Sequence, residues 1–273
     1  MPTTEGRPTR GTTGTNRLRR VDRWIAAHPA LRDADHPLVV DLGFGASGVT
    51  AFELASRLRR ARRDVAVRGL EIDPDRVARA RAQLEEVRAG RTVFAADLPV
   101  SFARGGFEVP LEGGRRPVVI RAFNVLRQYD EHEVRAAWGR MAERLAPEGV
   151  LVEGTCDELG RISSWVDVAP SGEPLRFSVS LRLAQLERPG VVAERLPKAL
   201  IHRNVPGERV HAFLQALDGE WERAAPLSTF GTVQRWLATV AALRHGGWPI
   251  ARAPRRWRLG EITLPWSAVA PAE

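Results

Sequence analysis

Short apolar runs alternate with longer amphipathic stretches between residues 38 and 154 of this 273-residue chain. Continuous apolar runs are typical of buried strands, whereas apolar residues recurring every three or four positions predict helices. The pattern predicts strands at 38–42, 65–71, 91–96, 117–123 and 149–154, and helices at 48–62, 74–88 and 131–145. Such regular alternation predicts a parallel sheet with helices on both faces.

The pattern changes on both sides of this alternating part. Residues 1–36 predict a disordered tail, rich in Thr, Gly and Pro, followed by a leading helix at about 17–28. Apolar runs at 162–168 and 175–183 flank a Pro-Ser-Gly turn and predict an antiparallel hairpin that closes a unit at 37–183. Residues 184–273 predict a small, mainly helical subdomain with helices at 210–221 and 229–243 and a strand at 257–264.

Two helix starts carry clear local signals. Asp73 stands before Pro74 and predicts an N-cap, because its side chain can accept the free backbone N–H groups of the first turn. Asp130, with Glu133 three residues later, predicts a reciprocal capping box. We assign these acids to structure and not to a metal site.

The turn after the first strand carries the strongest candidate chemistry. Gly43, Gly45 and Gly48 have the spacing G-x-G-x-x-G, which lets the backbone approach a ligand at the start of a helix. Asp41 precedes them by two residues, where dinucleotide-binding strands usually carry an apolar side chain. Glu71 ends the next apolar run, where a carboxylate can accept both hydroxyls of a ribose.

These residues resemble the first two motifs of the class I S-adenosylmethionine-dependent methyltransferases. Two further stretches match that family in order: 93–99, which resembles the third strand, and 144–152, which resembles the turn into the fifth strand with Glu148 in place of a glycine. The resemblance covers 38–183 and implies a Rossmann-like fold with a seven-stranded, mostly parallel sheet and a closing antiparallel hairpin. It implies S-adenosylmethionine as the cofactor, with the adenine amino group on Asp97. The implied cofactor residues are Asp41, Gly43, Gly45, Gly48, Glu71, Asp97 and Phe123.

The end of the fourth strand faces the methyl group in this family. No proline follows Asn124, so the N-P-P-Y signature of the amino methyltransferases is absent. The stretch 124–126 resembles chemotaxis-receptor glutamate methyltransferases, but it is too short to imply their substrate. Asn124, as a catalytic residue, and Arg121 and Tyr129, as substrate residues, are candidates for aligning a nucleophile or an anion. A structural role is the equal alternative for each.

The segment 197–207 contains the only lysine of the chain, Lys198, together with His202 and Arg203. His202 is a candidate general base, and the two cations are candidates for holding an anionic substrate. We expect this segment to lie near the ends of the fourth and fifth strands. The alternative is an ordinary polar surface loop.

The composition excludes disulfide bonds and cysteine metal clusters, because the chain has a single cysteine. Cys156 is the only cysteine, and we interpret it as a buried core thiol, with a nucleophile for an RNA base as the less favoured alternative. The six histidines have no metal-ligand spacing, so no metal is expected. The net charge of +8 comes almost wholly from arginines interspersed with acids, which indicates a GC-rich, actinobacterial genome more than a nucleic-acid surface.

The sequence therefore predicts an enzyme that transfers a methyl group from S-adenosylmethionine to an acceptor that it does not identify, whether small molecule, protein or RNA. The alternatives are an inactive cofactor-binding protein that serves as an interaction module, and an RNA methyltransferase. Without an apolar leader or a run of about eighteen apolar residues, the chain predicts a cytoplasmic protein with no membrane partner.

Overall fold

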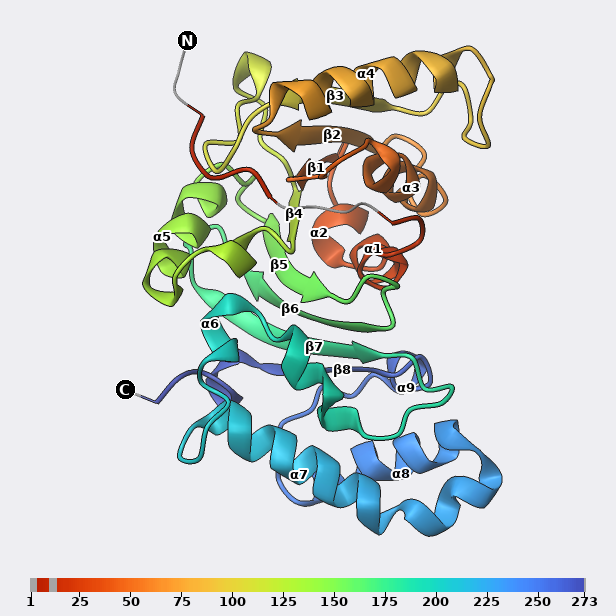
Figure 1. Cartoon of the computed structure of the whole chain (residues 1–273), viewed down its shortest axis with the longest axis vertical. Helices are drawn as coiled ribbons and strands as arrows, with labels where there is room; N and C mark the ends of the chain where they lie inside the picture. Colours follow the sequence, from red (N-terminus) through yellow and green to blue (C-terminus); the bar gives the residue numbers. More distant parts are fainter. Residues whose placement is uncertain (1–3, 10–13, 273) are drawn as a thin grey trace.

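The computed structural model describes residues 4–9 and 14–272, and leaves residues 1–3, 10–13 and 273 undescribed. An eight-stranded sheet with the strand order β3-β2-β1-β4-β5-β6-β7-β8 forms its centre (Figure 1). The strands are β1 (Leu38–Leu42), β2 (Ala66–Glu71), β3 (Val100–Arg104), β4 (Val119–Phe123), β5 (Val150–Cys156), β6 (Ile162–Val168), β7 (Pro174–Leu181) and β8 (Glu261–Pro265). The α-helices are α1 (Arg19–Ala26), α2 (Pro29–Arg32), α3 (Val49–Leu58), α4 (Pro74–Arg88), α5 (Glu131–Ala142), α6 (Lys198–Ile201), α7 (Arg209–Arg223), α8 (Thr232–His245) and α9 (Pro254–Trp257).

The topology of the sheet confirms a Rossmann-like α/β fold. The strands β3, β2, β1, β4 and β5 are parallel, and the winding reverses between β1 and β4. In such sheets the crevice at the reversal point is the usual place for a ligand. β6 and β7 form the predicted antiparallel hairpin beside β5. The predicted count of seven strands is wrong, because β8 extends the same sheet and pairs Leu264 with Phe177 of β7.

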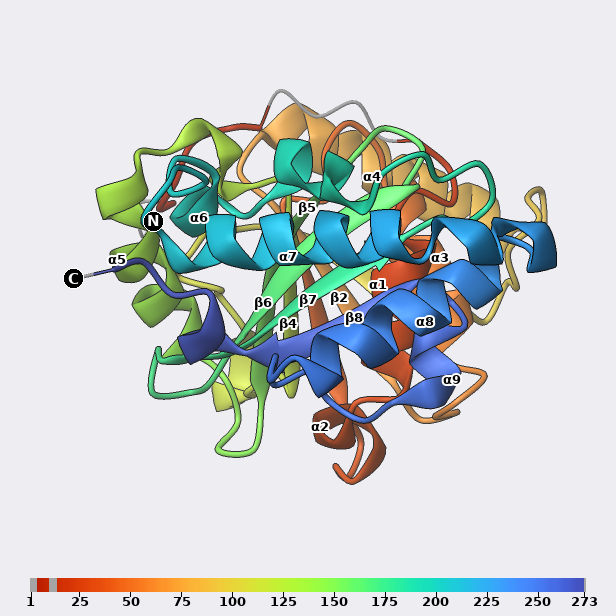
Figure 2. The same ribbon diagram turned by 90° about the horizontal axis from the view of Figure 1, so that it is seen from below.

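Helices cover both faces of the sheet. Successive residues of a strand point to opposite faces, so Val39 packs in a cluster with α1 to α4, whereas Val40 packs in a second cluster with α5, α7 and α8. Figure 2 shows α7 and α8 lying in front of the strands on this second face. The result is a three-layered molecule with one core on each side of the sheet. Among the described helices, none combines the length and the apolar character needed to cross a membrane.

The C-terminal residues share the core of the sheet. Trp221 of α7 and Trp236 of α8 belong to the same apolar cluster as Ile120 of β4 and Phe177 of β7. Because this part contributes both β8 and a covering layer, a separate mainly helical subdomain is not confirmed. The domain boundary at residue 183 remains a prediction.

The third strand lies later in the chain than predicted. The run 91–96 is irregular, with bends at 92–94 and Val93 96% exposed, and β3 instead begins at Val100. The β3 register places Phe102 opposite Gly69 of β2, where a Cβ built on the glycine would lie 2.5 Å from the aromatic ring. Because Gly69 has no side chain, the ring of Phe102 can pack over it. Apolar periodicity cannot predict this contact, because the two residues are 33 positions apart in the sequence.

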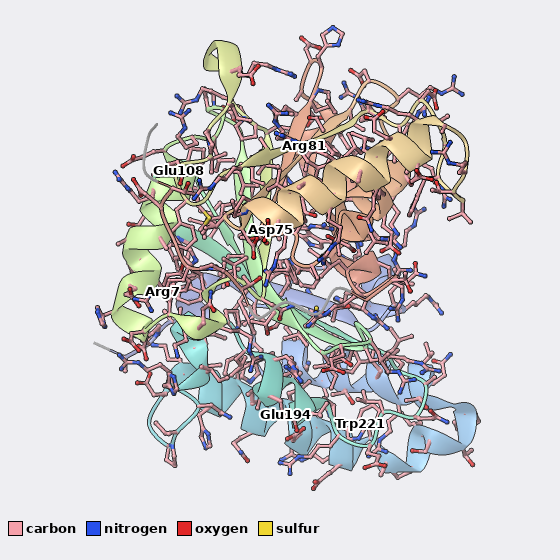
Figure 3. All side chains as sticks on the ribbon, turned by 45° about the horizontal axis from the view of Figure 1, so that its top comes forward. Arg7, Asp75, Arg81, Glu108, Glu194 and Trp221 are labelled. Carbon is pink, nitrogen blue, oxygen red and sulfur yellow. The ribbon has the colours of Figure 1, made fainter. Side chains whose placement is uncertain are left out.

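Residues 4–9 form a segment, here called the N-terminal strap, that lies against the carboxyl ends of the sheet. The backbone N–H of Phe107 donates to the carbonyl of Glu5 (3.0 Å), and the Glu5 N–H donates to the Glu108 carboxylate (2.9 Å). Arg7 forms an ion pair with Glu133 of α5 at 3.0 Å, and Figure 3 shows Arg7 against that helix. The prediction of a disordered tail is wrong for these residues. Its remaining part at 1–3 and 10–13 lies outside the described residues.

Candidate functional site

A cavity of about 700 Å³ lies at the carboxyl ends of β1 and β4, where the winding reverses. Its walls come from the glycine turn after β1, the end of β4 with the 3₁₀ helix η2 (Leu126–Gln128), the residues before α1, and the end of the 3₁₀ helix η3 (Pro189–Arg195). Topology therefore brings together segments that are far apart in the sequence. This cavity is the site that the sequence predicted for the cofactor, and the following paragraphs place each predicted residue relative to it.

The glycine turn has the backbone that its sequence predicts. Gly43 and Gly45 line the cavity and have φ values of 68° and 85°, a left-handed region that glycine adopts without steric cost. Gly48 has another role: it precedes α3, and a Cβ there would lie 2.7 Å from the ring of Phe102. The first two glycines thus shape the cavity wall, and the third lets α3 pack closely on the sheet.

Asp41 lines the cavity, but its carboxylate is already engaged. Arg121 of β4 contacts both oxygens, through Nε at 3.0 Å and Nη2 at 2.7 Å, and the Thr50 hydroxyl donates to Oδ2 at 3.1 Å. Arg121 also forms a buried ion pair with Asp22 of α1. Because Arg121 is fully buried and saturated by these carboxylates, the prediction that it contacts the substrate is wrong. It is a structural cation that joins β1, β4 and α1.

Glu71 stands at the end of β2, as predicted, beside the glycine turn. Its carboxylate accepts hydrogen bonds from the Gly45 N–H (3.0 Å) and the Ile72 N–H (2.9 Å), and the side chain is 2% exposed. Arg76, in the first turn of α4, lies 3.6 Å from the same carboxylate. Glu71 is not itself a lining residue of the cavity: it lies directly behind Gly45, which is one, and is held between the glycine turn and α4.

The N-terminal strap covers the side of the cavity next to Glu71. Arg76 donates to the carbonyl of Thr9 at 2.7 Å, and Thr9 itself lines the cavity. The backbone N–H of Arg7 donates to the hydroxyl of Tyr129, which is buried. Tyr129 therefore anchors the strap in this structure, and its predicted contact with a substrate remains a prediction.

Asn124 and Phe123, at the end of β4, both line the cavity. Asn124 has a φ of 59°, rare for a residue with a side chain, and its amide is clamped to β5. Its Oδ1 accepts from the Cys156 N–H at 3.1 Å, and its Nδ2 lies 3.3 Å from the Cys156 sulfur. Cys156 is fully buried, and burial raises the pKa of its thiol. The interpretation of Cys156 as a core thiol agrees with this environment.

Asp97 does not reach the cavity. It precedes β3, at the amino end of that strand and thus at the opposite edge of the sheet, and its side chain is 70% exposed. Arg59 donates to its carboxylate at 2.7 Å. The assignment of Asp97 to the adenine amino group is wrong, because it depended on the wrong position of the third strand. Asp97 was predicted to end that strand, whereas the strand begins after it, at Val100.

The segment 197–207 does not line the cavity either. Lys198 Nζ and His202 Nε2 are 3.0 Å apart at an exposed site, and Arg203 binds Glu131 of α5 (2.6 Å) and Glu208 (3.2 Å). None of the three lines the cavity. Their side chains bind one another and acids of α5 and the following loop, and η3 instead brings Arg195 into the cavity. That the segment lies near the ends of β4 and β5 remains a prediction.

Nine lining residues were not predicted as site residues: Thr9, Arg17, Leu18, Leu42, Phe44, Thr50, Arg127, Gln128 and Arg195. Arg127 lies in η2, three residues after Asn124. Its place directly after the fourth strand could have identified it as a candidate site residue. Arg195 has no local signal, since only the fold of the hairpin and η3 brings it to β4. Among the described residues, no group of His, Cys, Asp and Glu side chains is arranged to hold a metal ion.

Comparisons with known proteins give partial likenesses to methyltransferase structures. The chain is similar to a putative sarcosine dimethylglycine methyltransferase from Galdieria sulphuraria (21% identity, TM-score 0.35, covering 50% of this chain and 46% of that one). It is also similar to magnesium protoporphyrin IX methyltransferase from Synechocystis PCC 6803 with bound SAH (20% identity, TM-score 0.38, 52% and 55%). A third is the CcbJ methyltransferase from Streptomyces caelestis (19% identity, TM-score 0.39, 62% and 72%).

The chain spans about half the length of the first two of these structures. No family model and no curated protein matches its sequence. At these TM-scores the likenesses assign no function, which has to be argued from the residues of the cavity.

Proposed function

We propose that this protein is a class I S-adenosylmethionine-dependent methyltransferase. The observation that carries the proposal is the placement of the glycine turn: Gly43 and Gly45, both with positive φ, line a cavity at the reversal point of the sheet, beside Glu71 at the end of β2. A flexible backbone turn next to an acid at the neighbouring strand end suits a nucleoside that carries an amino-acid arm. The antiparallel strands beyond β5 agree with the motif resemblance.

In this proposal the glycine turn holds the amino-acid part of the cofactor and Glu71 holds the ribose hydroxyls. Since the N-terminal strap lies next to Glu71, it covers the nucleoside side of the site. When bound, S-adenosylmethionine supplies the electrophilic methyl group, so that catalysis is mainly positioning of the acceptor. Asn124 is the best-placed positioning group, because its contacts with Cys156 leave one amide hydrogen and one oxygen lone pair for a ligand.

Two alternatives fit the site less well. An inactive cofactor-binding protein would be expected to have side chains filling the space in front of β4, whereas Phe123 and Asn124 there line an open cavity. An RNA methyltransferase that uses a cysteine nucleophile needs an accessible thiolate, and Cys156 is buried with a raised pKa. Both observations support the proposed enzyme.

Calorimetry tests the proposal directly. We expect S-adenosylhomocysteine to bind with one site per chain and NAD to show no binding under the same conditions. Incubation with methyl-labelled cofactor and a cell extract, followed by separation of RNA, protein and small molecules, then assigns the class of acceptor. Binding of NAD, or of neither ligand, would overturn the proposal.

A further inference from the structure

The cavity is strongly biased toward positive charge. Its charged lining residues are Arg17, Arg127, Arg195 and Asp41. Because the Asp41 carboxylate is paired with buried Arg121, it does not offset the charge of the three lining arginines. A cavity of this sign favours an anionic ligand.

Arg127 and Arg195 lack the carboxylate partner that holds many other arginines of this chain. Arg203, for example, binds Glu131, and Arg59 binds Asp97. In the described part of the molecule, neither Arg127 nor Arg195 forms an ion pair. Within 4–9 and 14–272, Arg127 donates to one group, the backbone carbonyl of Glu194 (3.3 Å). Two guanidinium groups are thus available to a ligand at the same wall.

Arg195 is held in place by the sheet and still has an unused donor. Its backbone carbonyl accepts hydrogen bonds from the hydroxyls of Thr155 on β5 and Ser164 on β6. Its Nε atom is buried and has no hydrogen-bond partner among the described residues. Figure 3 shows its neighbour Glu194 on η3, beside the central sheet. A buried donor without a partner costs free energy, so such an atom is expected to gain a partner when the site is filled.

The arginines also act on one another. Burial, followed by the guanidinium group of Arg195 and more weakly that of Arg17, lowers the pKa of Arg127. Mutual repulsion of this kind is relieved when an anion binds between the groups, which adds to the binding free energy. Arg17 itself donates to the carbonyls of Asp157 (3.0 Å) and Cys156 (3.4 Å). Its contribution to the cavity is therefore its positive charge, and we do not include it among the groups that bind the ligand directly.

We propose that Arg127 and Arg195 form a subsite for the carboxylate of an anionic methyl acceptor, a small organic acid. Leu18 and Phe123 line the same cavity and provide apolar surface for the body of that molecule. The subsite lies beside Asn124, so an acceptor held by its carboxylate places its nucleophilic atom near the end of β4. This inference rests on the proposed methyltransferase function, and it names the substrate class of that same site.

The test compares benzoate with benzamide, its neutral isostere, as probes. Each is titrated by calorimetry into the protein saturated with S-adenosylhomocysteine. We expect benzoate to bind and benzamide to bind at least about tenfold more weakly, since a charge-assisted bidentate contact is lost. Arg127→Gln and Arg195→Gln should each weaken benzoate binding by about tenfold. Arg252→Gln, which removes the same charge at an exposed position outside the cavity, should leave it unchanged.

A second titration separates the acceptor from the cofactor, whose own carboxylate is the other possible anion. S-adenosylhomocysteine carries that carboxylate and 5′-methylthioadenosine lacks it. We expect both variants to bind the two nucleosides as the wild type does. A loss of affinity for S-adenosylhomocysteine alone would assign the arginines to the cofactor and overturn the inference.

The remaining outcomes are also decisive. Benzoate that fails to bind, or binds equally to wild type and both variants, overturns the subsite while leaving the methyltransferase proposal standing if S-adenosylhomocysteine binds. If S-adenosylhomocysteine does not bind, the proposed function fails. The benzoate titration is then run on the ligand-free protein, where Arg127-dependent and Arg195-dependent binding still identifies the anion site.

Discussion

Arg121 Nη2 lies 2.7 Å from Asp41 Oδ2, and both side chains are buried. The pair joins the middle of β4 to β1 directly below the cavity, and Asp22 of α1 completes it from the helix layer. The acid of the first motif is thus part of the frame that positions the glycine turn. The first prediction follows from this arrangement.

Arg121→Met should lower the free energy of unfolding by about 3–5 kcal/mol, because it leaves Asp41 and Asp22 buried without their cation. Urea unfolding followed by circular dichroism measures the change. Arg135→Met, at an arginine 57% exposed, is the matched control and should change stability by less than about 0.5 kcal/mol. A similar small effect at Arg121 would contradict the structural role.

Glu71→Ala should weaken binding of S-adenosylhomocysteine by about 1.5–3 kcal/mol, the usual loss for a hydrogen bond to a charged group. Asp97→Ala should leave the affinity unchanged, because Asp97 lies at the opposite edge of the sheet on Arg59. Calorimetry on both variants, each checked for an unaltered melting curve, gives the comparison. Equal losses would return Asp97 to the site, and no loss for Glu71→Ala would place the ribose elsewhere.

Removal of residues 1–9 should raise the apparent affinity for S-adenosylhomocysteine. The strap reaches the wall beside Glu71 through Arg76 and Thr9, so it must shift for the nucleoside to enter. If the covered state is favoured by about 1.4 kcal/mol, the gain is roughly tenfold. Stopped-flow binding should show it mainly as a faster association. A weaker affinity in the truncated protein would mean that the strap instead forms part of the bound site.

The free energy of unfolding should depend on pH because of Glu153, which lies in the middle of β5. No hydrogen bond of ordinary geometry reaches its carboxyl oxygens from the described residues. Burial raises the pKa of this group from 4.5 to about 8, and the indole of Trp138 opposes that rise only in part. The folded state therefore keeps a proton that the unfolded chain releases. Its stabilising effect is complete below pH 4.5 and is lost as the pH rises toward 8, by about 1.4 kcal/mol per pH unit.

Glu153→Gln, a neutral isostere, removes this one titration and leaves the others. The difference in unfolding free energy between Glu153→Gln and the wild type should therefore move in favour of the variant at each step from pH 5 to pH 8. Urea unfolding at pH 5, 6, 7 and 8 measures it. A difference that stays constant across these values would show that Glu153 is ionised in the folded protein.

Cys156 should be unreactive in the native protein. Its thiol is fully buried and its pKa is raised by that burial, so the thiolate that a disulfide reagent attacks is rare and inaccessible. Ellman's reagent should react with one thiol per chain in guanidinium chloride and with essentially none without it. Rapid reaction of the folded protein would reopen the interpretation of Cys156 as a nucleophile.

Local signals in the sequence predicted several strands, helices and helix caps of the fold. The strand Leu38–Leu42 and the helix Pro74–Arg88 have their predicted bounds. Asp73 caps α4 through the Asp75 and Arg76 N–H groups, and Asp130 with Glu133 forms the predicted capping box. The reason is physical: helix caps and glycine turns are decided by residues a few positions apart, and apolar periodicity reports burial within one element.

What the tertiary structure decided are the relationships between distant residues. The third strand begins at Val100 because Phe102 fits over Gly69, and the sheet gains β8 from the far end of the chain. Asp97 and Lys198 leave the candidate site and Arg195 enters it. The sequence by itself determined an α/β fold and the glycine turn on which the cofactor proposal depends. Which side chains surround that turn was decided by packing between segments distant in the sequence, up to the 150 residues between Gly45 and Arg195. Local pattern carries no information about which surfaces meet.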